Sequence, residues 1–404
     1  MTALSVTPSA PAPTAEAGFG LYVHWPFCRA KCPYCDFNSH VVADFDEDAW
    51  RQALLTDLDH ALHQMTEAGG KIRPLSSIFF GGGTPSLMPP PIMADIIERA
   101  VHLCGATGDC EITAEANPTS TETATLRAFQ EAGINRVSLG VQALNDDALR
   151  FLGREHSAAE ALDALRHARE LFDRVSFDLI YGRVGQTAAE WEAELTTALS
   201  FDLDHLSLYQ LTIEQGTQFY TRHRKGEILS LSDDDMATLY DMTADITKQA
   251  GLSHYEVSNY AKEGAQSRHN LIYWQTGDWL GIGPGATGRY RGNGQRHESV
   301  KRRSPTAYLQ QIAERGHAID SHYQETKEGY FEEVMMMGMR LKEGVPLIRL
   351  QDHLGLTSWP FASDMVNQLC EAGWLEVTDT RCRATDEGRL RLNYLLGQLL
   401  ASEA

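Results

Sequence analysis

Three closely spaced cysteines are the strongest chemical feature of this chain. Cys28, Cys32 and Cys35 form a C-x3-C-x2-C array. Thiolates on one short loop can converge on a single soft metal centre such as an iron–sulfur cluster. Four more cysteines are scattered and give no second pair of the kind that completes a tetrahedral zinc site. They are Cys104, Cys110, Cys370 and Cys382. A four-iron cluster bound by the array would keep one iron open to a non-protein ligand.

The residues around the array indicate which kind of metal site it forms. The pattern Y-x-H-x-P-F-C starts at Tyr22, and the pattern Y-C-D-F ends at Phe37. Together they resemble the radical S-adenosylmethionine (SAM) superfamily, and within it the branch that holds oxygen-independent coproporphyrinogen III oxidase and the haem chaperone HemW. The resemblance implies a [4Fe–4S] cluster on Cys28, Cys32 and Cys35, with SAM bound to the open iron. The alternative is a zinc-binding or buried cysteine cluster, which the spacing and the flanks disfavour.

Further candidate residues follow apolar stretches of the sequence. Gly82, Gly83 and Thr84 come after residues 77–80, and glycines there let the backbone approach a ligand closely. Glu115 ends another apolar stretch, where a carboxylate can accept hydrogen bonds from ribose hydroxyls. A solvated acid at a strand end is the alternative. The resemblance implies that these residues line the SAM pocket with four others, of which the arginine could pair with the SAM carboxylate. The four are Tyr22, Gln142, Arg154 and Asp178.

A second motif lies outside this set. His269, Asn270, Tyr273 and Trp274 form H-N-x-x-Y-W, which resembles a motif of HemW. An imidazole is a natural axial ligand of haem iron, and aromatic rings can pack on a porphyrin face. A histidine with its hydrogen bonds satisfied in an aromatic core is the alternative. The resemblance favours a haem site at His269, Tyr273 and Trp274.

Two features separate the branches of the family. In the oxidase a further cysteine stands two residues after the third, and this chain has Phe37 at that position. The other feature is the H-N-x-x-Y-W motif. We therefore expect a haem chaperone that binds a [4Fe–4S] cluster, SAM and haem and delivers haem to an acceptor, without coproporphyrinogen oxidase activity or assigned catalytic residues. The alternative hypothesis is oxidative decarboxylation of coproporphyrinogen III to protoporphyrinogen IX.

The elements that must position these residues alternate between strand and helix patterns. Strand patterns cover residues 19–24, 77–80, 111–115, 136–141, 175–180 and 205–211. Helix patterns include 46–68, 122–132, 158–172, 188–199 and 233–250. Such alternation predicts an α/β fold with a parallel sheet and right-handed crossovers. Six units are too few for a closed eight-stranded barrel, and the resemblance also implies an open (β/α)6 partial barrel. The carboxyl ends of its strands would line the site.

The rest of the chain suggests three parts. Residues 1–18 are predicted to be a disordered tail, because they are rich in proline and alanine and hold no basic residue. Residues 19–303 would form the partial barrel with its extension. Within them, 254–260 is expected to form a further edge strand, and 268–290 is expected to be a structured loop region. Residues 304–404 would form a smaller C-terminal winged-helix-like domain, from their helix–helix–hairpin–helix pattern.

Composition limits the expected partners. The 404 residues include 55 acidic and 35 basic side chains, for a formal net charge of −20. Such a surface repels nucleic acid and anionic membranes. The chain has no apolar run of membrane-spanning length and no signal-like start, so we expect a cytoplasmic protein without an integral membrane segment. A haem-acceptor protein and a reducing electron donor are expected as partners, and a homodimer is left open.

Overall fold

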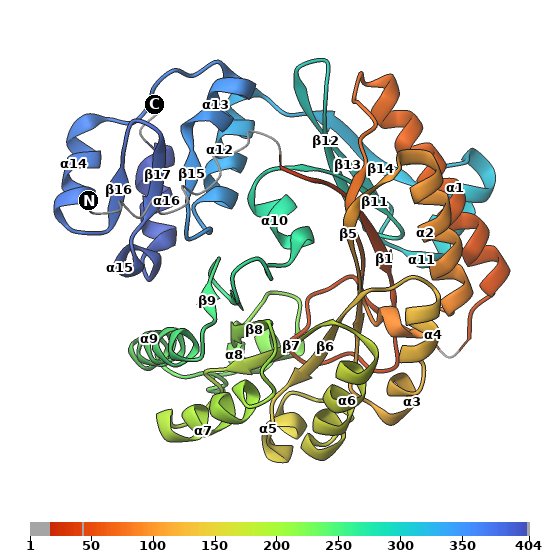
Figure 1. Cartoon of the computed structure of the whole chain (residues 1–404), viewed down its shortest axis with the longest axis horizontal. Coiled ribbons are helices and arrows are strands. Elements are labelled where there is room, and N and C mark those ends of the chain that lie inside the picture. Colours follow the sequence, from red (N-terminus) through yellow and green to blue (C-terminus); the bar gives the residue numbers. More distant parts are fainter. Residues whose placement is uncertain (1–16, 43, 402–404) are drawn as a thin grey trace, which may run out of the picture.

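The computed structural model describes residues 17–42 and 44–401. A curved sheet covered by helices forms the larger part, and a smaller domain follows at the C-terminal end (Figure 1). The predicted disordered tail lies almost entirely outside the described residues. Ala17, however, is buried, and Phe19 begins the first strand, so the packed part of the chain already includes residue 17.

Twelve strands of the described chain form one sheet, in the order β14-β13-β12-β11-β1-β4-β5-β6-β7-β8-β10-β9. Six of them follow one another in the chain, and each is parallel to the next. They are β1 (Phe19–Trp25), β4 (Leu75–Gly82), β5 (Ala106–Ala116), β6 (Arg136–Gln142), β7 (Arg174–Tyr181) and β8 (His205–Gln210). The sheet has two open edges, β14 and β9. The predicted open (β/α)6 partial barrel is therefore confirmed.

Helices cover the outer, convex side of this sheet (Figure 1). They are α1 (Glu47–Glu67), α2 (Pro90–Cys104), α3 (Ser120–Thr123), α4 (Leu126–Glu131), α5 (Asp146–Phe151), α6 (Ala158–Leu171) and α7 (Ala188–Leu199). The buried rings of Trp25 and Trp50 meet edge to face at 5.5 Å between β1 and α1. Because side chains alternate along a strand, Tyr22 and His24 of β1 face the concave side. The outer core thus orients the polar residues of β1 toward the interior of the barrel.

The structure corrects the expectation of a loop region at residues 268–290. This segment forms helix α10 (Arg268–Trp274) and strands β11 (Asp278–Ile282) and β12 (Thr287–Gly292). Strand β11 pairs parallel to β1 and extends the sheet. The glycines that suggested a loop serve close packing instead. A Cβ atom at Gly281 would lie 2.3 Å from the carbonyl oxygen of Thr287 on the neighbouring strand.

The structure also moves the predicted domain boundary at residue 304. Strand β13 (Gln295–Lys301) pairs with β14 (Ile319–Gln324), and helix α11 (Pro305–Arg315) connects them. Tyr308 and Ile312 of α11 belong to the hydrophobic core of the barrel. Residues 304–324 are therefore part of the barrel, and the second core begins with Tyr330. On the other edge, the single strand expected at 254–260 is two short strands, β9 (Ser253–His254) and β10 (Asn259–Ala261).

The C-terminal domain has its own hydrophobic core around Met335, Leu350 and Leu395. A three-stranded sheet in the order β15-β17-β16 packs with five helices. The elements are α12 (Lys327–Gly338), β15 (Val345–Pro346), α13 (Leu347–Leu354), α14 (Ser363–Glu371), β16 (Leu375–Val377), β17 (Arg381–Ala384), α15 (Asp386–Arg389) and α16 (Leu392–Ala401). Helices α13 and α14, the β16–β17 hairpin and α16 reproduce the order expected for a winged-helix-like unit.

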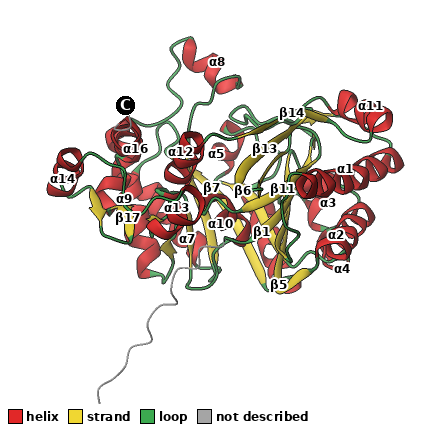
Figure 2. Ribbon diagram, turned by 90° about the horizontal axis from the view of Figure 1, so that it is seen from above, coloured by secondary structure: helices red, strands yellow, loops and turns green. Residues whose placement is uncertain are grey.

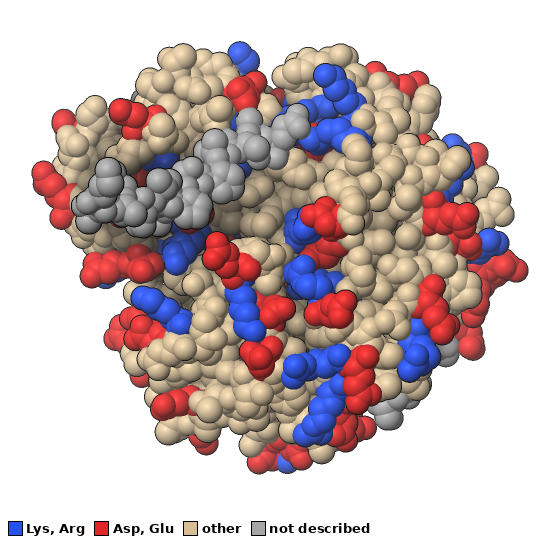
Figure 3. All heavy atoms as spheres, viewed as in Figure 1, with Lys and Arg blue, Asp and Glu red and all other residues tan. Residues whose placement is uncertain are grey.

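Two helices follow β8 before the sheet edge. They are α8 (Gln218–Arg224) and α9 (Asp233–Gln249). Figure 2 shows α8 standing out from the barrel. The backbone N–H of Phe219 in α8 donates to the carbonyl of Pro33, so α8 marks the end of the barrel where the cysteine loop lies. On the opposite face, basic and acidic side chains are interspersed (Figure 3).

Candidate cofactor site

A cavity of about 550 Å³ opens at the carboxyl ends of the parallel strands. Its volume is in the range of small-molecule and cofactor pockets. The cysteine loop and the ends of β4, β5, β6, β7 and β8 all contribute to its wall. Ten of the residues predicted from the sequence line it together: Cys28, Cys32, Cys35, Gly82, Gly83, Thr84, Glu115, Gln142, Arg154 and Asp178.

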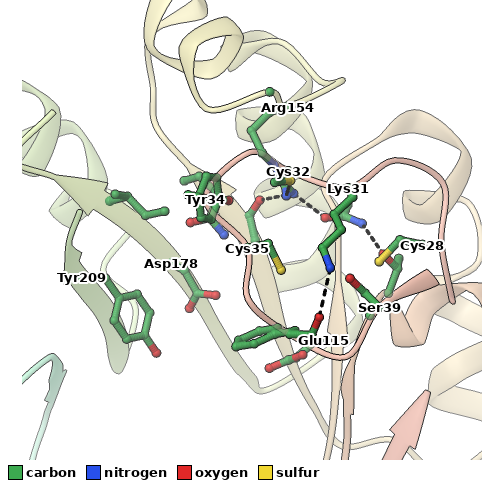
Figure 4. A pocket seen from close by; sticks show the side chains of 18 of the residues that line it. Cys28, Lys31, Cys32, Tyr34, Cys35, Ser39, Glu115, Arg154, Asp178 and Tyr209 are labelled. Carbon is green, nitrogen blue, oxygen red and sulfur yellow. Dashed lines mark hydrogen bonds between the residues drawn. The ribbon is translucent and has the colours of Figure 1, made fainter. Parts of the chain in front are cut away.

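The cysteine loop is closed by backbone hydrogen bonds. Strand β2 (Phe27–Cys28) pairs with β3 (His40–Val41), so the segment returns beside its own start. Inside the loop, the N–H of Cys35 donates to the carbonyl of Cys32 at 3.2 Å. The three cysteines therefore face one cavity from a short, self-braced segment (Figure 4).

The side chains of Thr84 and Arg154 donate hydrogen bonds to sulfur atoms of the cysteine loop. Thr84 Oγ1 lies 3.3 Å from Cys28 Sγ, and Arg154 Nη1 lies 3.2 Å from Cys32 Sγ. Burial raises the pKa of the Cys28 thiol, and the Thr84 hydroxyl opposes that shift. No three His, Cys, Asp or Glu side chains of the described residues are arranged around a single ion.

Arg154 links the cysteine loop to the strand ends. Its side chain donates to the Asn117 side chain and, at 3.0 Å, to the carbonyl of Gly140, in addition to Cys32. The guanidinium is charged at all accessible pH values and is planar. Its Nε–H is buried and has no partner in the structure. The guanidinium of Arg154 can therefore donate a further hydrogen bond to an anionic ligand, such as a carboxylate.

Two partly buried carboxyl groups face the cysteine loop across the cavity. Glu115 ends β5, and Asp178 lies on β7 (Figure 4). Burial, with a smaller contribution from Asp178, raises the pKa of Glu115 to about 8, and the backbone N–H of Gly82 opposes the shift. Burial raises the pKa of Asp178 to about 6. A ligand that brings positive charge or hydroxyl donors would stabilise the ionised forms.

The glycine segment is packed tightly against the start of the cysteine loop, and its role in SAM binding stays a prediction. The N–H groups of Gly83 and Thr84 donate to the carbonyls of Trp25 and Phe27 at 2.7 and 2.8 Å, so they are not directed at a ligand. A Cβ atom on Gly83 would lie 2.7 Å from the carbonyl oxygen of Phe27. Gly82 has φ of 112°, which side chains rarely allow. These glycines let the end of β4 pack against the start of the cysteine loop.

Tyr22 borders a second cavity of about 410 Å³ rather than the first. The two cavities share Phe37, Gly82 and Glu115 as wall residues. Phe37, which is 57% exposed, lies between them at the position where the oxidase branch has a cysteine. His24 also lines the second cavity, and it connects Tyr22 with the cysteine loop.

The structure places the H-N-x-x-Y-W residues away from both cavities. His269 is 1% exposed, and its two ring nitrogens lie 2.7 Å from Ser77 Oγ and 2.8 Å from Tyr273 Oη. Trp274 packs against the guanidinium of Arg340. In this conformation the imidazole has no nitrogen left for iron. A haem site at His269, Tyr273 and Trp274 stays a prediction, and it requires His269 to release one of its hydrogen bonds.

Several residues of the cavity were not predicted from the sequence. Tyr34 directly precedes Cys35, and Asn117 follows Glu115 by two residues, so their closeness to predicted residues was an available signal. Tyr209 of β8 faces the cysteine loop from across the cavity (Figure 4), and Tyr240 comes from α9. No local pattern marks these two, because only the curvature of the sheet brings them to the site.

Comparisons with known proteins agree with this geometry. The radical SAM superfamily pattern matches residues 22–198, and the HemN C-terminal domain pattern matches residues 326–391. The second match begins where the structure places the domain boundary. None of the helices in the described part of the chain combines the length and apolar character needed to span a bilayer.

Similar proteins cover nearly the whole chain. It is 36% identical to Heme chaperone HemW of Escherichia coli (strain K12), over 94% of this chain and 98% of that protein. It is 37% identical to Radical S-adenosyl methionine domain-containing protein 1, mitochondrial, of Bos taurus, over 98% of this chain and 90% of that protein. The solved structure of coproporphyrinogen III oxidase (HemN) from Escherichia coli shares the fold, with a TM-score of 0.77 and 22% identity over 96% and 91% of the two chains.

Proposed function

Because the chain belongs to the radical SAM superfamily, in the branch of the HemW haem chaperones, we propose that it binds a [4Fe–4S] cluster, SAM and haem and delivers haem to acceptor proteins. The observation that carries this proposal is the similarity to HemW proteins over 94% of the chain, combined with a cavity that gathers the three cysteines. Haem is the cargo in this proposal, and the cluster and SAM are resident cofactors.

The cysteine loop would bind the cluster. Cys28, Cys32 and Cys35 would supply three soft thiolates and leave a fourth iron of the cluster open. When the cluster is bound, this open iron would provide the binding position for SAM. The donors on Cys28 and Cys32 stabilise negative charge on sulfur, since a hydrogen bond to the charged form favours that form. Thr84 and Arg154 are therefore expected to support the cluster without ligating it.

The strand ends would bind SAM. Arg154 can pair with the SAM carboxylate through its remaining donor capacity, and Glu115 and Asp178 can accept from ribose hydroxyls or from the ligand's ammonium group. Gln142 lines the same cavity with φ of 70°, an unusual conformation for a residue with a side chain that is often found at binding sites. These groups would orient SAM within the cavity.

Phe37 supports the chaperone over the oxidase. The oxidase branch carries a thiol at this position, whereas this chain places an exposed aromatic ring between the two cavities. The ring cannot replace a thiol as a metal ligand or in redox chemistry. It can pack against a flat apolar ligand.

The alternative function is oxidative decarboxylation of coproporphyrinogen III, favoured by the shared fold with HemN. The test is an anaerobic incubation of the reconstituted protein with coproporphyrinogen III, SAM and reductant. The proposed haem delivery predicts that no protoporphyrinogen IX forms. Formation of protoporphyrinogen IX would show that the protein has the alternative function, oxidative decarboxylation.

The partners and location follow from the same proposal. A haem-acceptor protein and a reducing electron donor are required by the proposed cargo and cluster. The net charge of −20 disfavours nucleic acid as a partner. A cytoplasmic location is part of this proposal, and one group of relatives is named mitochondrial. A homodimer is left open.

A further inference from the structure

Helix α10 lies inside the curve of the barrel sheet (Figure 1). The Ser267 side chain caps its start, and the backbone N–H of Arg268 donates to Glu111 Oε1 of β5 at 2.9 Å. On its other side, Ile272 packs against β1 so closely that a Cβ atom on Gly20 would lie 3.0 Å from it. The helix is therefore fixed to the inward face of the sheet, beneath the strand ends that form the cofactor cavity.

His269 is buried on α10, with 1% of its surface exposed. Its hydrogen bonds to Ser77 and Tyr273 use both ring nitrogens. Burial, with Arg136 adding to the effect, lowers the pKa of His269 to about 3, so the ring is neutral. A neutral imidazole has one donor and one acceptor nitrogen, which matches one hydroxyl that accepts and one that donates. The ring orientation is thus fixed from both ends.

The fixed ring supports Tyr22. The imidazole stacks on Phe79, with centroids 4.9 Å apart, and on Tyr22 at 6.1 Å. Tyr22 and Phe79 also stack on each other at 6.4 Å. The three rings fill the space between α10 and the wall of the second cavity. Removing the imidazole would take away one of the two rings that support Tyr22 and leave a void beside Phe79.

Tyr22 in turn positions the return of the cysteine loop. The carbonyl of Asn38 can only accept, so His24 Nε2 donates to it, at 2.9 Å. Burial lowers the pKa of His24, so the neutral ring leaves Nδ1 as an acceptor for the Tyr22 hydroxyl at 3.0 Å. Asn38 follows Cys35 by three residues, and its side chain donates to the carbonyls of Pro284 and Arg303. A continuous series of contacts thus runs from His269 to the cysteine loop.

We propose that His269 is a positioning residue, which through the ring of Tyr22 and the hydrogen bond of Tyr22 to His24 fixes the cysteine loop and so sets the affinity for SAM. This inference rests on the proposed cluster and SAM site. It assigns the histidine of the H-N-x-x-Y-W motif a role in the interior of the barrel instead of in iron ligation. It also explains why both ring nitrogens are bonded within the protein.

Two substitutions separate the ring from its hydrogen bonds. His269→Phe keeps an aromatic ring under Tyr22 and removes both hydrogen bonds, whereas His269→Ala removes both the ring and the bonds. Because the proposed role depends on the ring of His269, SAM affinity should weaken by about tenfold or more in His269→Ala. In His269→Phe, which keeps a ring, it should stay within about threefold of wild type. Both variants should lose thermal stability, because Ser77 and Tyr273 are left with unpaired buried hydroxyls.

The experiment uses the full-length, anaerobically reconstituted protein with its cluster. SAM affinity is measured by equilibrium binding, and the electron paramagnetic resonance spectrum of the reduced cluster is recorded with and without SAM. His167→Ala, on the exposed side of α6, is the control and should match wild type. Tyr22→Phe keeps the ring and removes only the hydrogen bond to His24, so it should weaken SAM binding and alter the SAM-induced spectral change. It also tests the inference if His269→Ala fails to fold.

The outcomes distinguish this inference from the proposed function. Wild-type SAM affinity and spectra in His269→Ala, or in Tyr22→Phe if the former does not fold, would overturn the positioning role. Loss of a histidine-ligated haem spectrum in both His269 variants, with SAM binding intact, would overturn it in favour of iron ligation. A wild-type protein that binds no SAM would overturn both this inference and the proposed function.

Discussion

Replacing Glu115 with glutamine is expected to stabilise the ligand-free protein and to weaken its binding of SAM. Burial and Asp178 raise the pKa of Glu115 from 4.5 to about 8. A carboxyl group with a raised pKa in the folded state stabilises that state least at high pH. Its contribution is fully present below pH 4.5 and is lost as the pH rises toward 8. Glutamine is neutral throughout and can keep the acceptor for the Gly82 N–H.

The magnitude follows from that pKa. Each pH unit above 4.5 corresponds to 1.36 kcal/mol, so Glu115→Gln should raise the free energy of unfolding by up to about 3 kcal/mol at pH 7 and by less than about 1 kcal/mol at pH 5. The affinity for SAM should fall although the stability rises, because the variant loses a carboxylate acceptor worth about 1.5–3 kcal/mol. That corresponds to roughly 10- to 150-fold in affinity.

The assay is denaturant unfolding of the cluster-free protein at pH 5 and pH 7, followed by SAM binding to the reconstituted protein. Glu131→Gln, which changes an exposed glutamate on α4, is the matched control and should alter neither quantity. A Glu115→Gln protein that is less stable than wild type at pH 7 would refute the reasoning. So would a stability gain that is as large at pH 5 as at pH 7.

Other substitutions test other parts of the structure. Cys32→Ala should abolish the cluster on anaerobic reconstitution, whereas Cys370→Ala should retain it, as iron and sulfide analysis would show. Arg154→Met should weaken SAM binding by roughly 10- to 150-fold through the loss of a charged donor, with partial recovery in Arg154→Lys; unchanged affinity would remove Arg154 from the site. Lys301 forms a fully buried ion pair with Asp57 at 2.6 Å. Lys301→Met should therefore destabilise the protein by about 3–5 kcal/mol in denaturant unfolding, and the double variant with Asp57→Asn should be more stable than Lys301→Met alone.

The cysteine site and the barrel could be predicted because their signals are local. The spacing of Cys28, Cys32 and Cys35 limits them to one loop, whatever the fold around them. The six strands of the barrel core show apolar runs, and the rule that parallel strands end at one edge placed Glu115 and Asp178 near each other. Their raised pKa values could not be predicted, because they depend on how far distant elements shield the two carboxyl groups from water.

The parts that were mispredicted depend on contacts between distant residues. Residues 268–290 were predicted to be a loop because glycines usually interrupt helices and strands, yet Gly281 lets β11 and β12 pack closely. The boundary at residue 304 was misplaced because α11 resembles the start of a new unit, while its core partner is Trp50 of α1, which stacks on Tyr308 at 5.8 Å. The environment of His269 could not be predicted either, since no motif shows whether an imidazole faces a ligand or the core.

The most direct test of the proposed function is anaerobic haem transfer. Protein carrying its cluster, SAM and one equivalent of haem or less is mixed with an apo-haem protein, and the absorption spectrum and 5′-deoxyadenosine are followed together. Haem chaperone function predicts that the Soret band of the acceptor appears without a matching formation of 5′-deoxyadenosine. A wild-type protein that fails to bind haem, or that retains it in the presence of the acceptor, would contradict the account.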